Sequence, residues 1–105
     1  MKKIKNENEL AELLKEAMNE AVVLKYGAKW CNPCRVLEQT IEELNDAAVF
    51  AEVDADEADE DFLEKNKITN IPVLQFYRDG VLIDRTVGLI TKDALLNKIN
   101  EIKSK

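Results

Sequence analysis

Two cysteines separated by two residues are the side chains of this sequence best suited to redox chemistry. Cys31 and Cys34 are the only cysteines of the chain, and the segment around them reads KYGAKWCNPC, with Trp30 before the first cysteine and Pro33 between the two. Side chains three positions apart lie about one turn apart on the same face of a helix, so two thiols there can form and open a disulfide. The spacing therefore points to thiol chemistry at this segment.

The surroundings of the two cysteines predict different roles for them. The apolar run of residues 22–24 is typical of a buried strand that ends at Gly27, and a helical pattern follows the cysteines as far as about Leu44. Cys31 is thus expected at the start of a helix, where free N–H groups and the helix dipole stabilise a thiolate and lower the pKa of its thiol. We expect Cys31 to be the nucleophile and Cys34 the resolving thiol.

Two other interpretations of the cysteines stay open at this point. Both could be buried and inert, or they could form half of a zinc site that a second chain completes. A structural zinc site takes four ligands, and the chain contains no histidine, which also removes the commonest general base. Trp30 could belong to the core, but its position beside the nucleophile favours a side chain that faces the substrate.

Composition and charge limit the class of protein. A chain of 105 residues with 46% hydrophobic residues suits one domain, residues 1–105. Its 15 basic and 21 acidic residues leave a net charge of −6, which is not the electrostatic signature of a protein that binds nucleic acid or an anionic membrane. The sequence shows neither a secretion signal nor an apolar run long enough to cross a membrane. We expect a soluble, cytoplasmic protein that is a monomer.

Helical patterns occur in four places. The first covers residues 6–20 with Asn6 as its N-cap, and the second runs from the cysteines to about Leu44. The second helix is expected to turn four charged residues outward: Arg35, Glu38, Glu42 and Glu43. The segment DEDFLEKN predicts a short third helix after an acidic stretch that we expect to be a solvated loop, and Thr91 is the expected N-cap of the last helix.

Strand patterns alternate with these helices and then form a hairpin. AAVFAEVDAD alternates as a strand, and IPVLQFY and VLIDRTVG are separated by the turn residues 78–80, which include the Asp-Gly pair typical of hairpins. Alternating strands and helices followed by a hairpin and a helix predict an α/β fold with a mixed sheet, parallel on one side and antiparallel on the other.

Three segments carry a resemblance to a known family. AKWCNPCR resembles the active-site turn of the thioredoxin family, NIPVLQFYRDG resembles the segment that begins with the cis-proline of that family, and VGLITKDALLNKI resembles its glycine loop and final helix. The segments follow one another in the same order and at nearly the same separations as in the family. The sequence therefore resembles thioredoxins over nearly its whole length.

The resemblance implies the thioredoxin fold, a central mixed β-sheet flanked by four α-helices, and a function in reducing protein disulfides. It implies thioredoxin reductase, a flavin enzyme, and disulfide-containing proteins as partners, and no cofactor on this chain. It assigns the nucleophile to Cys31, the resolving thiol to Cys34 and a cis-proline to Pro72. It also implies a shallow apolar surface for substrate around five residues: Trp30, Ile71, Val87, Gly88 and Leu89. A more oxidising oxidoreductase or isomerase and a binding module without redox activity remain alternatives.

The sequence departs from the family pattern at three positions. Asn32 replaces the usual glycine between the cysteines, which leaves the redox potential open. Gln39 stands where the family often has a helix-kinking proline, so we expect a straighter second helix. Lys25 occupies the position where the family usually has a buried aspartate.

Lys25 therefore needs either a path to water or an anion, since an unpaired ammonium in a central strand would be costly. Alignment of AEVDAD with the corresponding strand of the family places Glu52 where many thioredoxins have a lysine. Our hypothesis is a reversed pair beneath Cys34, in which Glu52 takes over proton transfer and Lys25 stabilises thiolate charge. The alternative is that Lys25 reaches solvent at the end of its strand and Glu52 is an ordinary exposed residue.

Overall fold

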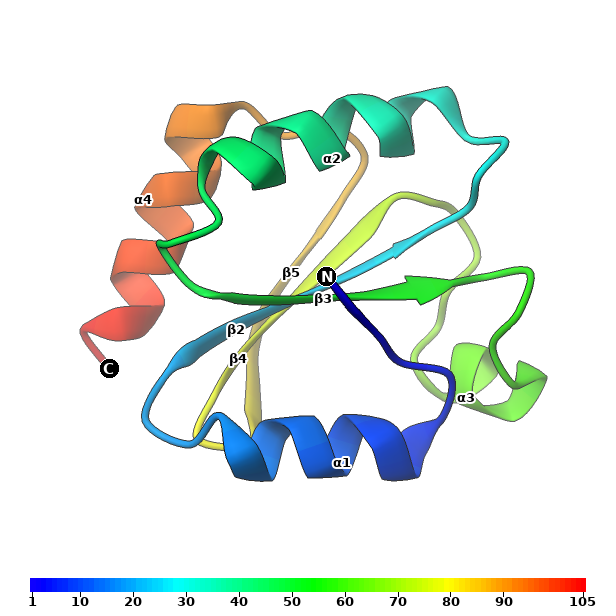
Figure 1. The fold of residues 1–105 in the computed structure, drawn as a ribbon, viewed down its shortest axis with the longest axis horizontal. Helices are drawn as coiled ribbons and strands as arrows, with labels where there is room; N and C mark the ends of the chain where they lie inside the picture. Colours follow the sequence, from blue (N-terminus) through cyan, green and yellow to red (C-terminus); the bar gives the residue numbers. More distant parts are fainter.

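A five-stranded sheet covered by helices on both faces forms the framework of the protein. The computed structural model describes all residues, 1–105 (Figure 1). The strands are β1 (Lys2–Lys3), β2 (Ala21–Gly27), β3 (Val49–Asp54), β4 (Val73–Arg78) and β5 (Val81–Val87). The helices are α1 (Glu7–Glu16), α2 (Asn32–Glu43), α3 (Glu60–Lys65) and α4 (Lys92–Lys103).

The strand order is β1-β3-β2-β4-β5, and β2 lies in the middle of the sheet. β3 runs parallel to both β1 and β2, whereas β4 is antiparallel to β2 and to β5. The expected mixed sheet, parallel on one side and antiparallel on the other, is therefore confirmed. Every residue of β2 is buried, which explains the continuous apolar run in its sequence.

The two faces of β2 belong to different halves of the core. Val22, Leu24 and Tyr26 pack with α1 and α3, whereas Ala21 and Val23 pack with α2, at the top of Figure 1, and with α4, at its left. Because side chains alternate along a strand, Lys25 and Gly27 share the face of Val23. This alternation directs the one buried lysine toward helix α2.

Most of the expected elements occur where the sequence placed them. Cys31 is the N-cap of α2, which runs without interruption across Gln39, and Thr91 caps α4 by accepting a hydrogen bond from the Ala94 N–H at 3.2 Å. β4 and β5 form the expected hairpin. Asp79 and Gly80 both have positive φ, at 51° and 80°, as a tight two-residue hairpin turn requires.

Two features differ from the sequence-based expectation. Helix α1 ends at Glu16 rather than at residue 20, because the chain turns there toward β2: Asn19 has a φ of 72°, and its N–H donates to Asp79 Oδ1 at 2.7 Å. Strand β1 was not predicted at all. It contains only Lys2 and Lys3, both exposed, so no apolar alternation marks it in the sequence.

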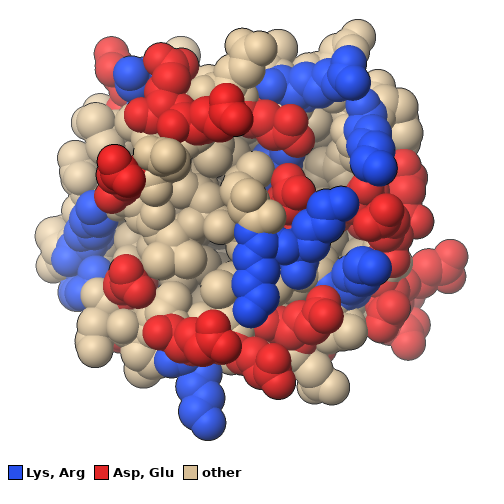
Figure 2. Space-filling model, in the orientation of Figure 1, with Lys and Arg blue, Asp and Glu red and all other residues tan.

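Charged side chains are numerous on the face of the molecule drawn in Figure 2. Figure 2 shows basic and acidic side chains interspersed on one face. The two signs largely cancel, so the net charge is only −6 although 34% of the residues are charged. None of the four helices combines the length and the apolar character that spanning a membrane requires.

Three buried polar side chains tie β2 to β4. The hydroxyl groups of Tyr26 and Tyr77 both donate to Gln75 Oε1, at 2.8 Å and 2.9 Å, and Gln75 Nε2 donates to Asn66 Oδ1. Burial is the main cause that raises the pKa of both tyrosines, and it raises the pKa of Tyr77 to about 12. Both hydroxyl groups therefore stay protonated in the folded protein well above the pH at which free tyrosine ionises.

We expect the free energy of unfolding to fall as the pH rises from about 10 to about 12. In this range the tyrosines of the unfolded chain lose their protons while those of the folded protein keep them, so the unfolded state becomes favoured. Tyr77→Phe should remove roughly 1 kcal/mol of this decline per pH unit, because one pKa unit corresponds to that free energy. Urea unfolding at several alkaline pH values measures the slope, and equal slopes in the wild type and the variant would contradict the assignment.

Candidate redox-active site

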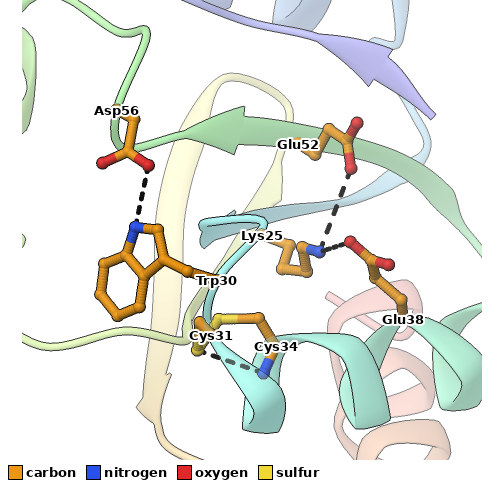
Figure 3. The surroundings of a disulfide bond; sticks show 7 residues. All are labelled: Lys25, Trp30, Cys31, Cys34, Glu38, Glu52 and Asp56. Atoms are coloured by element: carbon orange, nitrogen blue, oxygen red, sulfur yellow. Dashed lines mark hydrogen bonds and ion pairs between the residues drawn. A yellow bond between two sulfur atoms is a disulfide. The ribbon is translucent and has the colours of Figure 1, made fainter.

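The two cysteines form a disulfide at the junction of β2 and α2. Their Cα atoms are 5.3 Å apart. Cys31 has extended backbone dihedrals as the N-cap, and its Sγ accepts a hydrogen bond from the Cys34 N–H at 3.3 Å (Figure 3). Pro33 fits within the first helical turn because no partner is needed there for the N–H that proline lacks. The sequence around the cysteines thus places one sulfur at a helix start, where N–H groups favour negative charge.

The two sulfur-bearing residues differ in access to solvent. Cys31 is 5% exposed, whereas Cys34 is 1% exposed and lies inside the first turn of α2. Both residues are buried, but Cys31 is the more exposed of the two, so an incoming molecule meets Cys31 first.

Two loops from distant parts of the chain complete the surroundings of the disulfide. Ile71 packs against the small cluster that contains both cysteines, and the Ile71–Pro72 peptide bond is cis. The Gly88 N–H donates to the Pro72 carbonyl at 2.8 Å, which holds the end of β5 beside this loop. Gly88 has a φ of +87°, a backbone conformation that favours glycine. Three of the residues expected to form a docking surface, Ile71, Pro72 and Gly88, therefore lie next to one another.

Three apolar side chains near this site face solvent: Trp30, Val87 and Leu89, each more than half exposed. The indole N–H of Trp30 donates to Asp56 Oδ2 at 2.9 Å, so the ring is held against the loop after β3 (Figure 3). Asp56 was not among the predicted site residues, because it lies in the acidic stretch that was assigned to a solvated loop. The only feature that could have indicated Asp56 is its position just after β3, which ends at the same edge of the sheet as β2 because the two strands are parallel.

Lys25 is buried and lies between two carboxylates. Its side chain is 4% exposed, and its Nζ lies 2.6 Å from Glu38 Oε1 and 4.0 Å from Glu52 Oε2 (Figure 3). Lys25 and Glu52 are direct neighbours in the parallel register of β2 and β3. The side chain does not reach solvent, so the alternative in which Lys25 extends into water is wrong.

The shorter contact of Lys25 is with a residue that the sequence analysis placed on the outer face of α2. Glu38 is indeed half-exposed, but its carboxylate points from α2 toward Lys25 and accepts the hydrogen bond of the ammonium (Figure 3). The spacing contained a usable signal, since Glu38 lies four residues after Cys34 and therefore one turn along the same side of the helix. A cavity of about 140 Å³ adjoins this charge cluster and is lined by Lys25, Glu38, Glu52 and neighbouring residues.

Comparison with known proteins identifies the family. The family model for thioredoxin matches residues 1–101, and the chain belongs to the thioredoxin family. It is 37% identical over 98 residues to the thioredoxin of Mycoplasmoides gallisepticum, covering 90% of this chain and 95% of that relative. Among solved structures, a mutant thioredoxin from Halobacterium salinarum has a TM-score of 0.87 at 28% identity, over 97% of this chain and 89% of that one. Fasciola hepatica thioredoxin has a TM-score of 0.81 at 28% identity, over 97% of this chain and 99% of that one.

Family membership and the Cys31–Cys34 disulfide together support a thiol–disulfide oxidoreductase. Members of this family generally work with disulfide-containing substrates and with reductases. The expected fold, a mixed sheet of five strands with four helices, is confirmed as that of the family.

We expect alkylation of the reduced protein to modify Cys31 at least tenfold faster than Cys34. Cys31 is more accessible to the reagent, and its position at the helix start favours the reactive thiolate. Mass spectrometry after a short exposure to iodoacetamide at neutral pH measures both rates. Cys31→Ser provides the control, since it leaves only the buried thiol of Cys34. Equal rates at the two positions would contradict the assignment of different roles.

Proposed function

We propose that the protein reduces disulfide bonds of other proteins by dithiol–disulfide exchange. The observation that supports this most strongly is the position of Cys31, at the start of α2 and beside the Ile71–Pro72 loop. The helix start favours the thiolate, which is the form of cysteine that attacks a disulfide. The neighbouring loops offer apolar surface to a protein substrate.

The reaction proceeds in two exchanges. The Cys31 thiolate attacks one sulfur of the substrate disulfide, forms a mixed disulfide with it and releases the other substrate sulfur as a thiolate. Cys34 then loses its proton, and its thiolate attacks the Cys31 sulfur, which releases the second substrate sulfur. The product on the protein is the Cys31–Cys34 disulfide, the state that the structure contains.

The substrate segment docks in extended form across the two loops. Its backbone pairs with the backbone at Ile71, as an added strand would, and its side chains lie against Trp30, Pro72, Val87 and Gly88. Trp30 and Val87 are exposed enough to contact a bound chain, at 69% and 59% exposure. A shallow surface of this kind accepts many sequences, which suits a general reductant.

The proton that Cys34 loses needs an acceptor. Lys25 cannot accept it while protonated, but two carboxylates lie at the lysine, Glu38 and Glu52. Glu52 is the acceptor that the sequence predicted, and Glu38 is a second candidate because it follows Cys34 by one helical turn. Lys25 stabilises the negative charge that develops on the sulfur.

The protein returns to its dithiol form by reaction with thioredoxin reductase, and this cycle operates in the cytoplasm and maintains cellular redox balance. A more oxidising role, in forming or rearranging disulfides, is the second candidate. The observation in its favour is the buried cation at Lys25, which would stabilise the reduced protein.

Variants of the two cysteines test the proposed reaction. Cys31→Ser should abolish reduction of a disulfide-bonded test protein such as insulin, because the nucleophile is lost. Cys34→Ser should instead accumulate the mixed disulfide, because the first exchange still occurs and the second cannot. Non-reducing gel electrophoresis and a turnover assay with dithiothreitol as electron donor measure both. Full activity of Cys31→Ser would contradict Cys31 as the nucleophile, and no reduction of insulin by the wild type would favour the binding-module alternative.

The docking surface is tested by two valines of the same strand. Val87→Asp should lower kcat/KM for a protein substrate about tenfold, because it places a charge on the surface that a substrate must cover, a loss of roughly 1.4 kcal/mol. Val81→Asp is the matched control: Val81 lies at the other end of β5 and is 57% exposed, against 59% for Val87. Equal losses in both variants would show that the effect comes from the strand and not from docking.

A further inference from the structure

Lys25 is the only lysine or arginine that the structure buries, and its effect on the thiol–disulfide equilibrium goes beyond the stabilisation of the sulfur during the proposed reaction. It lies on the central strand β2, between Val23 and Gly27 on the face that α2 covers. A buried ammonium without a partner would be costly, and Glu38 and Glu52 supply the compensating charge.

The lysine and the resolving cysteine border the same small space. A methyl group added at Gly27 would lie 3.1 Å from Cys34 Sγ and 3.5 Å from Lys25 Cε. Gly27 therefore leaves room for the sulfur and for the end of the lysine side chain on the same side of β2. Figure 3 shows Lys25 above the disulfide, with its ammonium turned toward Glu38.

The charges around Cys34 differ in their contact with water. The side chain of Lys25 is 4% exposed, whereas those of Glu38 and Glu52 are 47% and 23% exposed. Water screens the two carboxylates more than it screens the ammonium, so their effect on the sulfur is weaker than their number indicates. The ammonium is therefore the charge near Cys34 that water screens least.

We propose that Lys25 and Glu38 set the thiol–disulfide equilibrium of the cysteine pair: the ammonium stabilises the reduced, ionised pair, and the Glu38 carboxylate limits that stabilisation. An opposite charge a few ångströms from a thiol favours the thiolate, and an added negative charge opposes it. Only the reduced protein carries a thiolate, so the balance of the two charges shifts the equilibrium between dithiol and disulfide.

The equilibrium is defined by a balanced exchange with glutathione. Two glutathione thiols supply two electrons and two protons, the Cys31–Cys34 bond breaks, and the bond of glutathione disulfide forms. The proton that the reduced cysteine pair then loses passes to solvent. Lys25 and Glu38 are thus positioning residues that act on the energy of the sulfurs and form no bond with substrate.

The two residues make opposite predictions. Lys25→Met keeps the length and apolar stem of the side chain but removes the cation, so the equilibrium should move about tenfold toward the disulfide, which corresponds to about 30 mV. Glu38→Gln retains a hydrogen-bond acceptor for Lys25 but removes the anion, so the equilibrium should move about threefold toward the dithiol. Both constants are measured in glutathione buffers at mildly alkaline pH, near the pKa of an ordinary cysteine thiol.

Two further variants serve as controls. Glu42→Gln removes an equal charge from the exposed side of the same helix and should leave the equilibrium unchanged, since no ion pair involves Glu42. Glu52→Gln should shift the equilibrium in the same direction as Glu38→Gln but less, because Glu52 lies farther from the ammonium. If Glu52→Gln had the larger effect, Glu52 and not Glu38 would be the carboxylate that limits the effect of Lys25, and the role given to Glu38 would be wrong.

Shifts of the Lys25 and Glu38 variants in the same direction, or no shift in either, would overturn the proposal. Opposite shifts would support it, because disturbed packing alone would not depend on the sign of the charge that is removed. If Lys25→Met does not fold, Glu38→Gln decides alone, since it changes a half-exposed side chain. The relevance of this equilibrium to the reduction of protein substrates rests on the proposed function. The glutathione equilibrium involves no protein substrate, so a chain inactive toward insulin would still give this result.

Discussion

The stabilisation of a sulfur anion in a site with little access to water is the constraint on which the arrangement of this protein depends. A thiolate needs hydrogen-bond donors or positive charge, and a helix N-terminus provides both without an added side chain. The structure meets this need by ending the central strand β2 at Gly27 and beginning α2 directly after Cys31. The strand fixes where the helix begins, and the helix start fixes the chemistry of the sulfur.

The rest of the fold supports this junction from two sides. Helices α2 and α4 cover one face of the sheet and bury the apolar side of α2, which keeps the first turn of that helix in place. On the antiparallel side, β4 and β5 carry the loops of Pro72 and Gly88 to the disulfide, where a hydrogen bond joins them. Segments distant in the sequence thus meet beside the disulfide.

The charges beneath the site depart from the pattern of the family. A lysine stands where thioredoxins usually have a buried aspartate, and its partners are two glutamates on different elements, Glu38 on α2 and Glu52 on β3. Reversing the sign of the buried group reverses its effect on a neighbouring thiolate, although the fold remains that of the family. Under the role proposed for Lys25, fold and family membership do not by themselves specify the redox equilibrium of this chain, because that equilibrium then depends on a few charges near one sulfur.

The sequence by itself determined the alternation of strands and helices, the caps at Cys31 and Thr91, and the hairpin turn at Asp79 and Gly80, because period, capping and turn chemistry are local properties. It did not determine where α1 ends or that Lys2–Lys3 forms a strand, since both depend on contacts with distant residues.

Only the tertiary structure showed that Glu38 is the nearer partner of Lys25 and that Asp56 holds the indole of Trp30. Helical periodicity placed Glu38 on the outer side of α2, and its side chain is half-exposed in the structure. It could not show that this side lies above the end of β2, where a buried ammonium needs an anion, because the relative placement of helix and sheet comes from packing across the whole core.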